Sequence, residues 1–370
     1  MIVKAAVLYN PNSLLIVEEL SQQNPKYGEV LVKVGAAGIC ASDHHVMLGQ
    51  ATVPLPIVLG HEGSGIVESV GYGVESIRPG DRCVLSFVSN CGHCRSCNGG
   101  FPNLCDTNRL SGTRQYDNTL RLTNTDGIGV HQFTKLGVFA EKIVIPAQAC
   151  HKIPDSVPME VACLIGCSVT TGVGAVINQP NIRPGMTIAV FGAGGVGLNT
   201  VQGARLINAE KIIVVDIHDH KLEFAYKFGA TDVVNARNTD PSTFIQKLTG
   251  GRGVDFGFDT YGSDITTEQM IKAVTKGGTG VIVGLAAEGV NAGIDMVDIV
   301  RNQKSLVGSY YGTSSPHETF SKLIEFYLKG RIDIDNLITR KYSLDEINVA
   351  YNALANGEDG RGVIIFPEVN

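Results

Sequence analysis

Short segments that alternate apolar and polar residues dominate roughly the first 165 residues of the chain. Residues 30–34 and 66–70 alternate, residues 81–87 are mostly apolar, and Gly, Pro and Asn interrupt the chain at short intervals. Short strands separated by frequent turns are typical of an all-β unit that is partly closed or barrel-like. We therefore expect a β-rich region at the start of the chain.

The pattern changes near residues 184–185, where apolar runs begin to alternate with segments of helical spacing. We expect strands at 187–191, 212–216, 233–234, 254–260 and 279–285, and helices at 195–208, 221–228, 242–248 and 265–274. This alternation predicts βαβ units that form a parallel sheet with helices on both faces. The run at 212–215 is apolar throughout, as in strands that are buried on both faces.

Beyond residue 305 the alternation weakens, with an expected helix at 316–328 and a last strand at 362–366 that could pair with the first region. We therefore expect a nucleotide-type α/β domain inserted into a β-rich domain that both chain ends build. The expected boundaries are 1–168 for the N-terminal part of the β-rich domain, 169–308 for the nucleotide domain, and 309–370 for the return to the β-rich domain.

Composition narrows the function classes. The chain has 370 residues, 44% hydrophobic and 18% charged, with a net charge of −6 and no run of five like charges. This globular, mildly acidic composition disfavours nucleic-acid binding and a polybasic membrane patch, and no apolar segment approaches the ~20 residues of a membrane helix. The nine cysteines, with no export signal at the N-terminus, favour reduced thiols in the cytoplasm.

A glycine-rich loop joins the expected strand at 187–191 to the next helix; it consists of Gly192, Ala193, Gly194, Gly195, Val196 and Gly197. This G-x-G-x-x-G spacing allows a tight turn and a close approach of the backbone to a pyrophosphate, which the helix N-terminus also attracts. Asp216 ends the next expected strand. An acid there accepts hydrogen bonds from both ribose hydroxyls and repels a 2′-phosphate, so the motif predicts NAD rather than NADP.

Four cysteines lie within fifteen residues: Cys91, Cys94, Cys97 and Cys105. Four thiolates can surround one tetrahedral Zn²⁺ at about 2.3 Å each, which leaves no position for a substrate. We expect a structural zinc site in this lobe, with an iron–sulfur cluster and a disulfide pair as the alternatives. His93 lies inside the lobe, where cysteines already fill the ligand set.

A second, dispersed set consists of Cys40, His61 and Cys167. Two cysteines and one histidine leave a zinc ion with one open position, which is the pattern of a catalytic site. Spacing alone does not show that the three meet, and an isolated cysteine is more often a small buried apolar residue. The remaining histidines without a convincing partner, expected at the surface or in the core, are His151, His218, His220 and His317.

In this order the motifs resemble those of the zinc-dependent medium-chain alcohol dehydrogenases, over essentially the whole chain. The segments that carry the resemblance are 38–45, 60–63, 91–105, 166–167, 192–197 and 361–362. The resemblance implies an α/β protein in which a GroES-like β-rich catalytic domain is combined with a Rossmann doubly wound parallel sheet. It places the active site in the cleft between the two domains.

The resemblance also implies roles for individual residues. Catalytic zinc would be held by Cys40, His61 and Cys167, with Glu62 beside it, and structural zinc by the four-cysteine lobe, so two zinc ions per chain. Ser42 would hydrogen-bond the zinc-bound alcohol, His45 would end the proton relay, and Asp43 would hydrogen-bond the His61 side. Residues implied in NAD binding are the loop from Gly192 to Gly197, Asp216, Lys221, Gly284 and Arg361. Phe87 and Phe133 would line the substrate channel.

The main expectation is therefore an enzyme that transfers hydride between a primary or secondary alcohol and NAD. Segments 85–91 and 308–312 also resemble the bacterial nicotinoprotein alcohol dehydrogenases, which hold NAD tightly. The glutathione-dependent formaldehyde dehydrogenases, which oxidise a thiol adduct, are a further alternative, although residues 49–55 lack the acids of that group. Ala41 stands where many relatives have a basic residue that contacts the pyrophosphate, so one phosphate contact is missing. A non-catalytic NAD-binding protein is disfavoured because the catalytic set is complete. The long loop at 110–139 implies a homodimer, with a homotetramer as the alternative.

Overall fold

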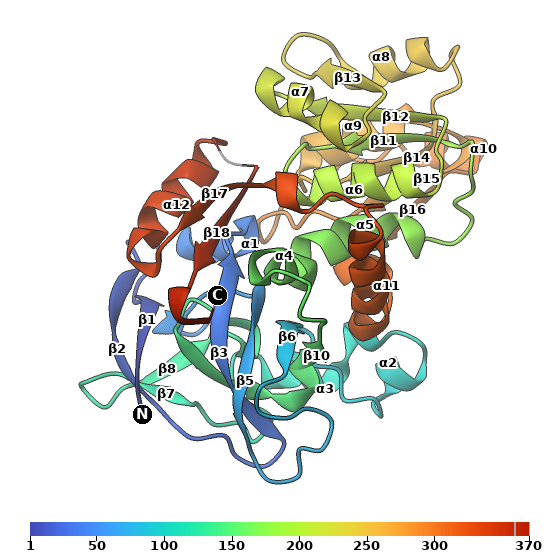
Figure 1. Ribbon diagram of the computed structural model, residues 1–370. Coiled ribbons are helices and arrows are strands. Elements are labelled where there is room, and N and C mark those ends of the chain that lie inside the picture. The colour runs from blue at the N-terminus through green and yellow to red at the C-terminus, as the bar shows by residue number, and fades with distance from the viewer. Residues whose placement is uncertain (359, 370) are drawn as a thin grey trace. The chain divides into compact units, whose positions relative to one another are not determined.

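The computed structural model describes residues 1–358 and 360–369 and divides into two units. The first unit contains Met1–Cys167, Ser315–Leu328 and Ile334–Asn370, and the second contains Ser168–Ser314 and Lys329–Asp333. The second unit is thus a long insertion in the chain of the first (Figure 1).

The first unit is built on β-structure. A closed barrel has the order β1 (Ile2–Leu8), β2 (Ile16–Gln22), β7 (Leu122–Thr123), β8 (Gly129–Gln132) and β4 (Ile57–Val58). A seven-stranded sheet has the order β10 (Cys150–Lys152), β6 (Arg82–Leu85), β5 (Gly63–Val70), β3 (Glu29–Gly38), β18 (Arg361–Ile365) and β17 (Ile338–Tyr342), with β9 (Lys142–Pro146) also paired to β3. Strand β18 runs antiparallel to β3, with Val363 opposite Gly38, so the expected pairing of the last strand with the first region is confirmed.

Helices that the alternation pattern did not predict interrupt this β-rich unit. They are α1 (Ala41–Met47), α2 (Arg95–Asn98), α3 (Asp106–Ser111), α4 (Met159–Leu164) and α12 (Ile347–Ala355), while α11 (Pro316–Leu328) lies where a helix was expected. An all-β reading of the first 165 residues was therefore too simple. Helices α1, α2 and α3 are each seven residues or shorter, which is too short for a 3.6-residue period to show in the sequence.

The second unit contains a parallel six-stranded sheet. Its strand order is β13 (Asp232–Asn235), β12 (Lys211–Asp216), β11 (Thr187–Phe191), β14 (Val254–Asp259), β15 (Val274–Ile282) and β16 (Ser305–Gly308). When the six strands are numbered 1 to 6 along the chain, their order across the sheet is 3-2-1-4-5-6, which is the order of the dinucleotide-binding Rossmann sheet. The associated helices are α5 (Thr170–Ile177), α6 (Gly195–Leu206), α7 (Asp219–Phe228), α8 (Pro241–Leu248), α9 (Asp264–Ala273) and α10 (Met296–Asn302).

Apolar side chains of these strands form the core of the second unit. Every residue of β11 is buried, and Phe191 packs in one cluster with Ile213, Ile245 and Met270. Strand β15 begins at Val274, five residues before its predicted start, and contains Gly277 and Gly278. The other expected strands and helices of this unit are confirmed, with ends shifted by one or two residues.

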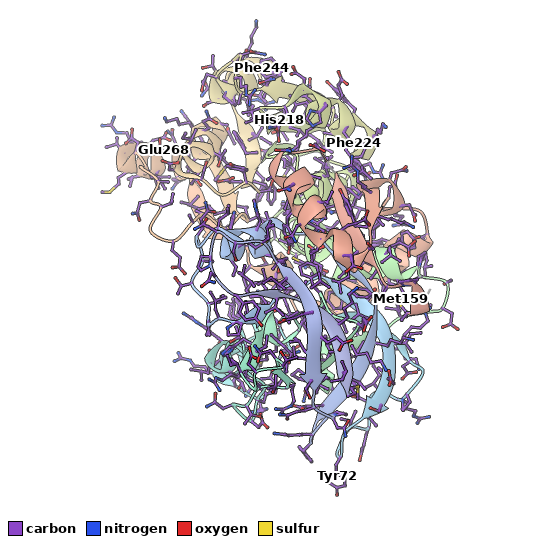
Figure 2. The ribbon with its side chains drawn as sticks, turned by 90° about the vertical axis from the view of Figure 1, so that its left-hand side faces the viewer. Tyr72, Met159, His218, Phe224, Phe244 and Glu268 are labelled. Carbon is purple, nitrogen blue, oxygen red and sulfur yellow. The ribbon has the colours of Figure 1, made fainter. Side chains whose placement is uncertain are left out.

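One helical stretch, Met159–Ile177, is long and apolar enough to cross a membrane by length and composition. However, 83% of its most apolar window is buried inside the protein. The start of the stretch packs in the first unit, where the Ser64 hydroxyl donates to the carbonyl of Met159 at 2.7 Å (Figure 2). Burial among other elements explains its apolar composition, as in the core helix of a globular protein.

His151 and His317, which lacked partners in the sequence, form a pair in the first unit. Their Nδ1 atoms are 3.2 Å apart, and their other ring nitrogens contact the Ser321 hydroxyl and the Gln148 carbonyl. Because one Nδ1 must accept the proton that the other donates, the two rings cannot both be protonated without losing this contact. Burial lowers the pKa of His151 to about 4 and also lowers that of His317.

This pair predicts a loss of stability in mild acid. An unfolded histidine takes up a proton below about pH 6.5, whereas folded His151 resists protonation until about pH 4, so stability falls as the pH falls between these values. Since the rings are partly exposed, we expect a loss of about 1 kcal/mol between pH 7 and pH 5. Urea unfolding of His151→Gln at both pH values should show a smaller loss, with His220→Gln as control. An equal pH response in wild type and His151→Gln would contradict this assignment.

Candidate functional site

Three separate segments of the first unit carry the dispersed metal-ligand set. Cys40 is the residue before α1, two residues after β3 ends at Gly38. His61 lies in the turn between β4 and β5, which Gly60 enters with a φ of +91° that favours glycine. Cys167 lies in a π-helical turn, Ile165–Val169, that follows α4. Such turns inside helices are frequent at functional sites.

The ligand atoms of Cys40, His61, Glu62 and Cys167 all lie within 4.8 Å of one another, and all four residues are buried. Two sulfur atoms on one tetrahedral zinc ion are about 3.8 Å apart when each Zn–S bond is about 2.3 Å. Two thiols, one imidazole and a carboxylate oxygen in this space therefore fit a zinc ion. The structure brings together the three ligands expected from the sequence and adds Glu62 to them.

The protonation of the two thiols also suits a metal. A hydrogen bond from the Cys167 thiol, together with the nearby His61, holds the pKa of Cys40 well below its usual value despite burial. The same hydrogen bond and burial raise the pKa of Cys167 well above its usual value. One of the two sulfurs is therefore held as a thiolate, the form that binds metal ions. Release of the second proton would accompany metal binding.

The buried carboxylate of Asp43 orients the imidazole ring of His61. Asp43 Oδ2 lies 3.0 Å from His61 Nδ1, and Asp43 Oδ1 accepts a hydrogen bond from the backbone N–H of Gly60 at 2.8 Å. Burial lowers the pKa of His61, but attraction to Asp43 and Cys40 outweighs it and the pKa is raised well above its usual value. A carboxylate behind a metal-ligating histidine fixes its tautomer and leaves the other nitrogen for the metal.

Glu62 and Arg361 form a buried ion pair beside the ligands. The guanidinium of Arg361 donates to Glu62 Oε2, while Glu62 Oε1 has no hydrogen-bond partner among the described residues. Burial raises the pKa of Glu62 to about 8, and Arg361 partly opposes this. Arg361 was expected at the pyrophosphate of NAD; the structure shows it in β18, 6% exposed, with Glu62 as its partner. Sequence offered no signal for this pair because 299 residues separate its members.

Ser42 and His45 lie one helical turn apart on α1, so they share a face of that helix. Ser42 Oγ is 3.9 Å from Cys40 Sγ, which places the hydroxyl beside the ligand cluster. Two aromatic rings also approach the cluster edge-on. The ring centroid of His61 is 5.4 Å from that of Phe87 and 5.7 Å from that of Phe133. These apolar rings therefore stand next to His61, and their expected place in the wall of a substrate channel stays a prediction.

The four-cysteine lobe forms a second cluster in the first unit. The sulfur atoms of Cys91, Cys94, Cys97 and Cys105 lie within 4.8 Å of one another, and all four are free thiols. Backbone N–H groups donate to three of these sulfurs at 3.3–3.5 Å, and the Thr107 hydroxyl donates to Cys91. Such hydrogen bonds stabilise thiolates, so the lobe fits a four-coordinate zinc site without an open position. The ring of His93 contacts the Cys91 carbonyl and not the four sulfur atoms.

The glycine-rich loop of the second unit connects the carboxyl end of β11 to α6. Gly192 has a φ of +101°, and a Cβ on Gly197 would stand 1.8 Å from the Gly192 carbonyl oxygen. A Cβ on Gly194 would meet nothing within 4 Å. Two glycines therefore make the turn possible and the third leaves open space in front of the α6 N-terminus, where first-turn N–H groups, including those of Gly195 and Val196, have no helical acceptor.

Asp216 follows the pattern expected for the ribose acid. Its Oδ2 accepts a hydrogen bond from Ala193 N–H at 2.8 Å, and its Oδ1 accepts from Ile217 and His218 N–H. The carboxylate is thus fixed beside the loop, at the carboxyl end of β12. Lys221 lies in the first turn of α7 just after it. Gly284 follows β15, where its N–H donates to Asp259 and a Cβ would stand 2.5 Å from Gly262 N.

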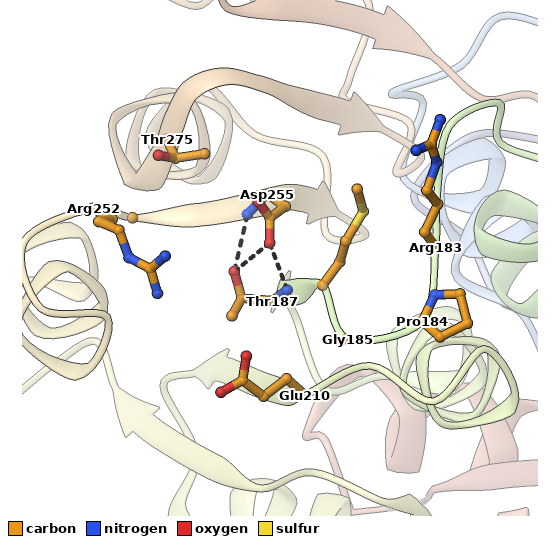
Figure 3. A pocket seen from close by; sticks show the side chains of 10 residues that line it. Arg183, Pro184, Gly185, Thr187, Glu210, Arg252, Asp255 and Thr275 are labelled. Carbon is orange, nitrogen blue, oxygen red and sulfur yellow. Dashed lines mark hydrogen bonds between the residues drawn. The ribbon is translucent and has the colours of Figure 1, made fainter.

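A hollow of about 350 Å³ lies at the opposite end of this sheet (Figure 3). Thr187, the first residue of β11, lines it, about 16 Å along the strand from the glycine-rich loop. Asp255 accepts hydrogen bonds from Thr187 N and Oγ1 at 2.7 and 2.9 Å, as the dashed lines show. Because ligands of open α/β sheets bind beyond the carboxyl ends of the strands, this hollow is not the expected nucleotide site.

Comparison with known proteins agrees with this geometry. Residues 26–155 match the alcohol dehydrogenase GroES-like domain, and residues 195–329 match the zinc-binding dehydrogenase domain. Alcohol dehydrogenase B of Mycobacterium tuberculosis is 35% identical over 99% of this chain and 98% of its own length. The structure of benzyl alcohol dehydrogenase from Acinetobacter calcoaceticus is 33% identical with a TM-score of 0.91, and covers 99% of both chains.

A further solved relative, an alcohol dehydrogenase from Escherichia coli CFT073 in complex with NADH, is 27% identical with a TM-score of 0.82 over 99% of both chains. Its cofactor agrees with the Rossmann strand order and the glycine-rich loop found here. The two cysteine-containing clusters lie outside residues 195–329, and two such metal-ligand sets agree with the zinc-binding dehydrogenases that this family model describes. The chain belongs to the zinc-dependent medium-chain alcohol dehydrogenase family, and it is an oxidoreductase whose cofactors are zinc and a nicotinamide dinucleotide.

Proposed function

We propose that this enzyme oxidises a primary or secondary alcohol with NAD⁺, or reduces the corresponding carbonyl compound with NADH. Cys40, His61 and Cys167 hold the catalytic zinc ion in this proposal, and the four-cysteine lobe holds a structural one. The observation that carries it is the convergence of these three buried ligands with the Ser42 hydroxyl in the first unit. A purely structural zinc site would not require an alcohol-binding hydroxyl at its edge.

When bound, zinc would supply a Lewis acid that lowers the pKa of an alcohol, and the nicotinamide would supply a hydride acceptor. The Ser42 hydroxyl would accept the alcohol proton while releasing its own, and His45, one helical turn away on the same face of α1, would be the final proton acceptor. Asp43 holds His61 in the orientation that presents its other ring nitrogen to the metal. Arg361 holds Glu62 beside the other ligand groups, and the Phe87 and Phe133 rings, which contact His61 edge-on, would exclude water.

The proposed coenzyme is NAD rather than NADP. The loop from Gly192 to Gly197 would bind the pyrophosphate, with Gly284 beside it, and Asp216 and Lys221 would bind the adenosine ribose. The fixed carboxylate of Asp216 supports this choice, since Ala193, Ile217 and His218 hold it at the end of β12 where a 2′-phosphate would be repelled. Arg361 remains a proposed pyrophosphate ligand in addition to its contact with Glu62.

We propose an apolar, aromatic alcohol as the preferred substrate class. Two phenylalanine rings that flank the zinc ligand offer apolar surface and edge-to-face contacts to an aromatic ring. The likeness to a benzyl alcohol dehydrogenase points the same way.

The decisive experiment follows NADH absorbance when desalted enzyme is mixed with NAD⁺ or NADP⁺ and alcohols from ethanol to benzyl alcohol. We expect steady NADH formation, with kcat/KM at least about tenfold higher for benzyl alcohol than for ethanol, because burial of a ring contributes more than about 1.4 kcal/mol. Equal values across the panel would contradict the aromatic preference. Zinc-loaded enzyme that gives no steady NADH would contradict a freely exchanging coenzyme and favour either tightly held NAD or a thiol-adduct substrate.

A homodimer, with a homotetramer as the alternative, is proposed for the assembly. Strand β16 is an edge strand whose described partner is β15 alone. Helix α10 exposes Met296, Val297 and Val300 by 77, 55 and 74%, an apolar surface that a second copy would cover. Analytical ultracentrifugation measures the oligomeric state directly, and a monomer at micromolar concentration would refute the proposed dimer.

We also propose a reducing, cytoplasmic location, which the free cysteines at both clusters support.

A further inference from the structure

Lys135 is a buried lysine in the 3₁₀ turn Phe133–Lys135, which follows β8. It is 1% exposed, and its Nζ donates hydrogen bonds to the carbonyls of Asn108 and Gly112 at 2.6 and 3.0 Å. The ammonium also lies 5.7 Å from the ring centroid of Tyr116. A buried charge without a carboxylate partner is costly, so two backbone carbonyls and an aromatic face compensate it here.

Those two carbonyls belong to the far end of the four-cysteine lobe. Helix α3 begins directly after the cysteine ligand Cys105 and is followed by Gly112. Carbonyls at the end of a helix have no intrahelical donor and attract a cation. Lys135 therefore ties the segment that leaves the four-cysteine lobe to the turn that begins with Phe133.

The backbone of this turn is itself unfavourable. Thr134 and Lys135 have φ values of +53° and +68°, in the left-handed region that costs a non-glycine residue about 1 kcal/mol each. The amide of Gln115 donates to the Lys135 carbonyl at 3.2 Å and helps to hold the turn. Consecutive strained residues persist only where surrounding contacts determine the conformation, and they cluster at functional sites.

The same helix also reaches the segment that carries the second phenylalanine. The Asn108 side chain contacts the Phe87 carbonyl at 3.5 Å and accepts a hydrogen bond from the Ser89 hydroxyl at 3.2 Å. Asn108 thus touches the Phe87 segment through its side chain and the Phe133 turn through its carbonyl and Lys135. The rings of Phe87 and Phe133 are the two that meet His61 edge-on.

We propose that Lys135 is a positioning residue that, acting through helix α3, sets the positions of the Phe87 and Phe133 rings that meet His61 edge-on and thereby the fit of an apolar alcohol. The four-cysteine lobe is then part of the support of the substrate pocket as well as a folded metal site. This inference rests on the proposed function, because it takes these two rings to be the walls of the alcohol site.

The test compares Lys135→Met, which keeps the length of the side chain but removes the ammonium, with Lys142→Met as the matched control. Lys142 lies on β9 of the same unit and pairs with Glu68. We expect Lys135→Met to keep two zinc ions per chain, to raise KM for benzyl alcohol about tenfold, and to change kcat and the ethanol KM less than twofold. Asn108→Ala, which leaves the backbone carbonyl for Lys135, should produce a smaller shift in the same direction.

A second readout does not depend on turnover. In protein labelled with 4-fluorophenylalanine, the ¹⁹F signals of Phe87 and Phe133, assigned with the corresponding leucine variants, should move in Lys135→Met and Asn108→Ala but not in Lys142→Met. Unchanged signals in both variants would overturn the inference, as would a loss of zinc with an equal fall in kcat/KM for every alcohol. If wild-type enzyme oxidises no alcohol while these signals still respond, the proposed function fails and the positioning role stands.

Discussion

Cys40→Ala is expected to reduce kcat/KM for every alcohol by at least about 10³-fold, because the metal contributes several kcal/mol of transition-state stabilisation. Cys40 contributes one of the two sulfurs of the buried ligand set, and alanine leaves His61 and Cys167 with Glu62 alone. We expect zinc per chain to fall from two ions to one, since the four-cysteine lobe is a separate cluster. Atomic absorption and steady-state kinetics measure the two effects on the same preparation.

Cys83→Ala provides the control for this experiment. Cys83 is a buried cysteine of β6 that belongs to neither cluster, and its thiol contacts the Gly65 carbonyl at 3.5 Å. It should keep both zinc ions and nearly full turnover, although removal of the buried sulfur lowers stability by about 1 kcal/mol. Full turnover by correctly folded Cys40→Ala would show that the catalytic zinc lies elsewhere.

Gly197→Ala is expected to destabilise the second unit by about 3 kcal/mol or more and to abolish detectable NAD binding. The new methyl group would stand 1.8 Å from the Gly192 carbonyl oxygen and 2.9 Å from Thr260 Oγ1. Because the first of these is a backbone atom, the strand β11 and helix α6 must separate to admit it, and overpacking of this kind is strongly destabilising. Thermal unfolding and titration with NADH, followed by its fluorescence, measure the two effects.

Gly194→Ala separates the structural role of the loop from its binding role. A Cβ there meets no atom within 4 Å, and Gly194 has a φ of −81° that alanine adopts readily. We expect a change in stability of less than about 1 kcal/mol, the usual scale for a helix N-cap position. If the pyrophosphate approaches this open backbone, the methyl group should raise the dissociation constant of NADH at least about tenfold. Unaltered NADH affinity would place the pyrophosphate elsewhere.

The local motifs were predictable because their chemistry is encoded in short spacings. The four cysteines from Cys91 to Cys105 lie in one short lobe, so local folding alone brings them together. The glycines from Gly192 to Gly197 lie in a single strand–helix turn. The alternation of apolar runs after residue 184 likewise predicted the parallel sheet, because strands buried on both faces are apolar throughout. Short helices in the first unit escaped prediction since a helix such as α2, with four residues, spans barely one turn.

The dispersed site depended on the tertiary structure. In the sequence, Cys167 lies 127 positions after Cys40, and His61 lies between them. Only the packing of α1, the β4–β5 turn and the π-helical turn brings the ligand atoms of all three within 4.8 Å. The family resemblance identified these three residues as metal ligands, whereas their spacing in the sequence could not.

By itself, then, the sequence determined the fold class, the nucleotide loop and the four-cysteine lobe, because backbone freedom and ligand chemistry are properties of residue types. Tertiary structure decided which buried groups meet: Arg361 against Glu62, Lys135 against the carbonyls that end α3, and His151 against His317. Each of these contacts joins segments that are distant along the chain or held in an unusual backbone conformation. Their energies come from burial and from the geometry of a single partner, neither of which leaves a periodic pattern in the sequence.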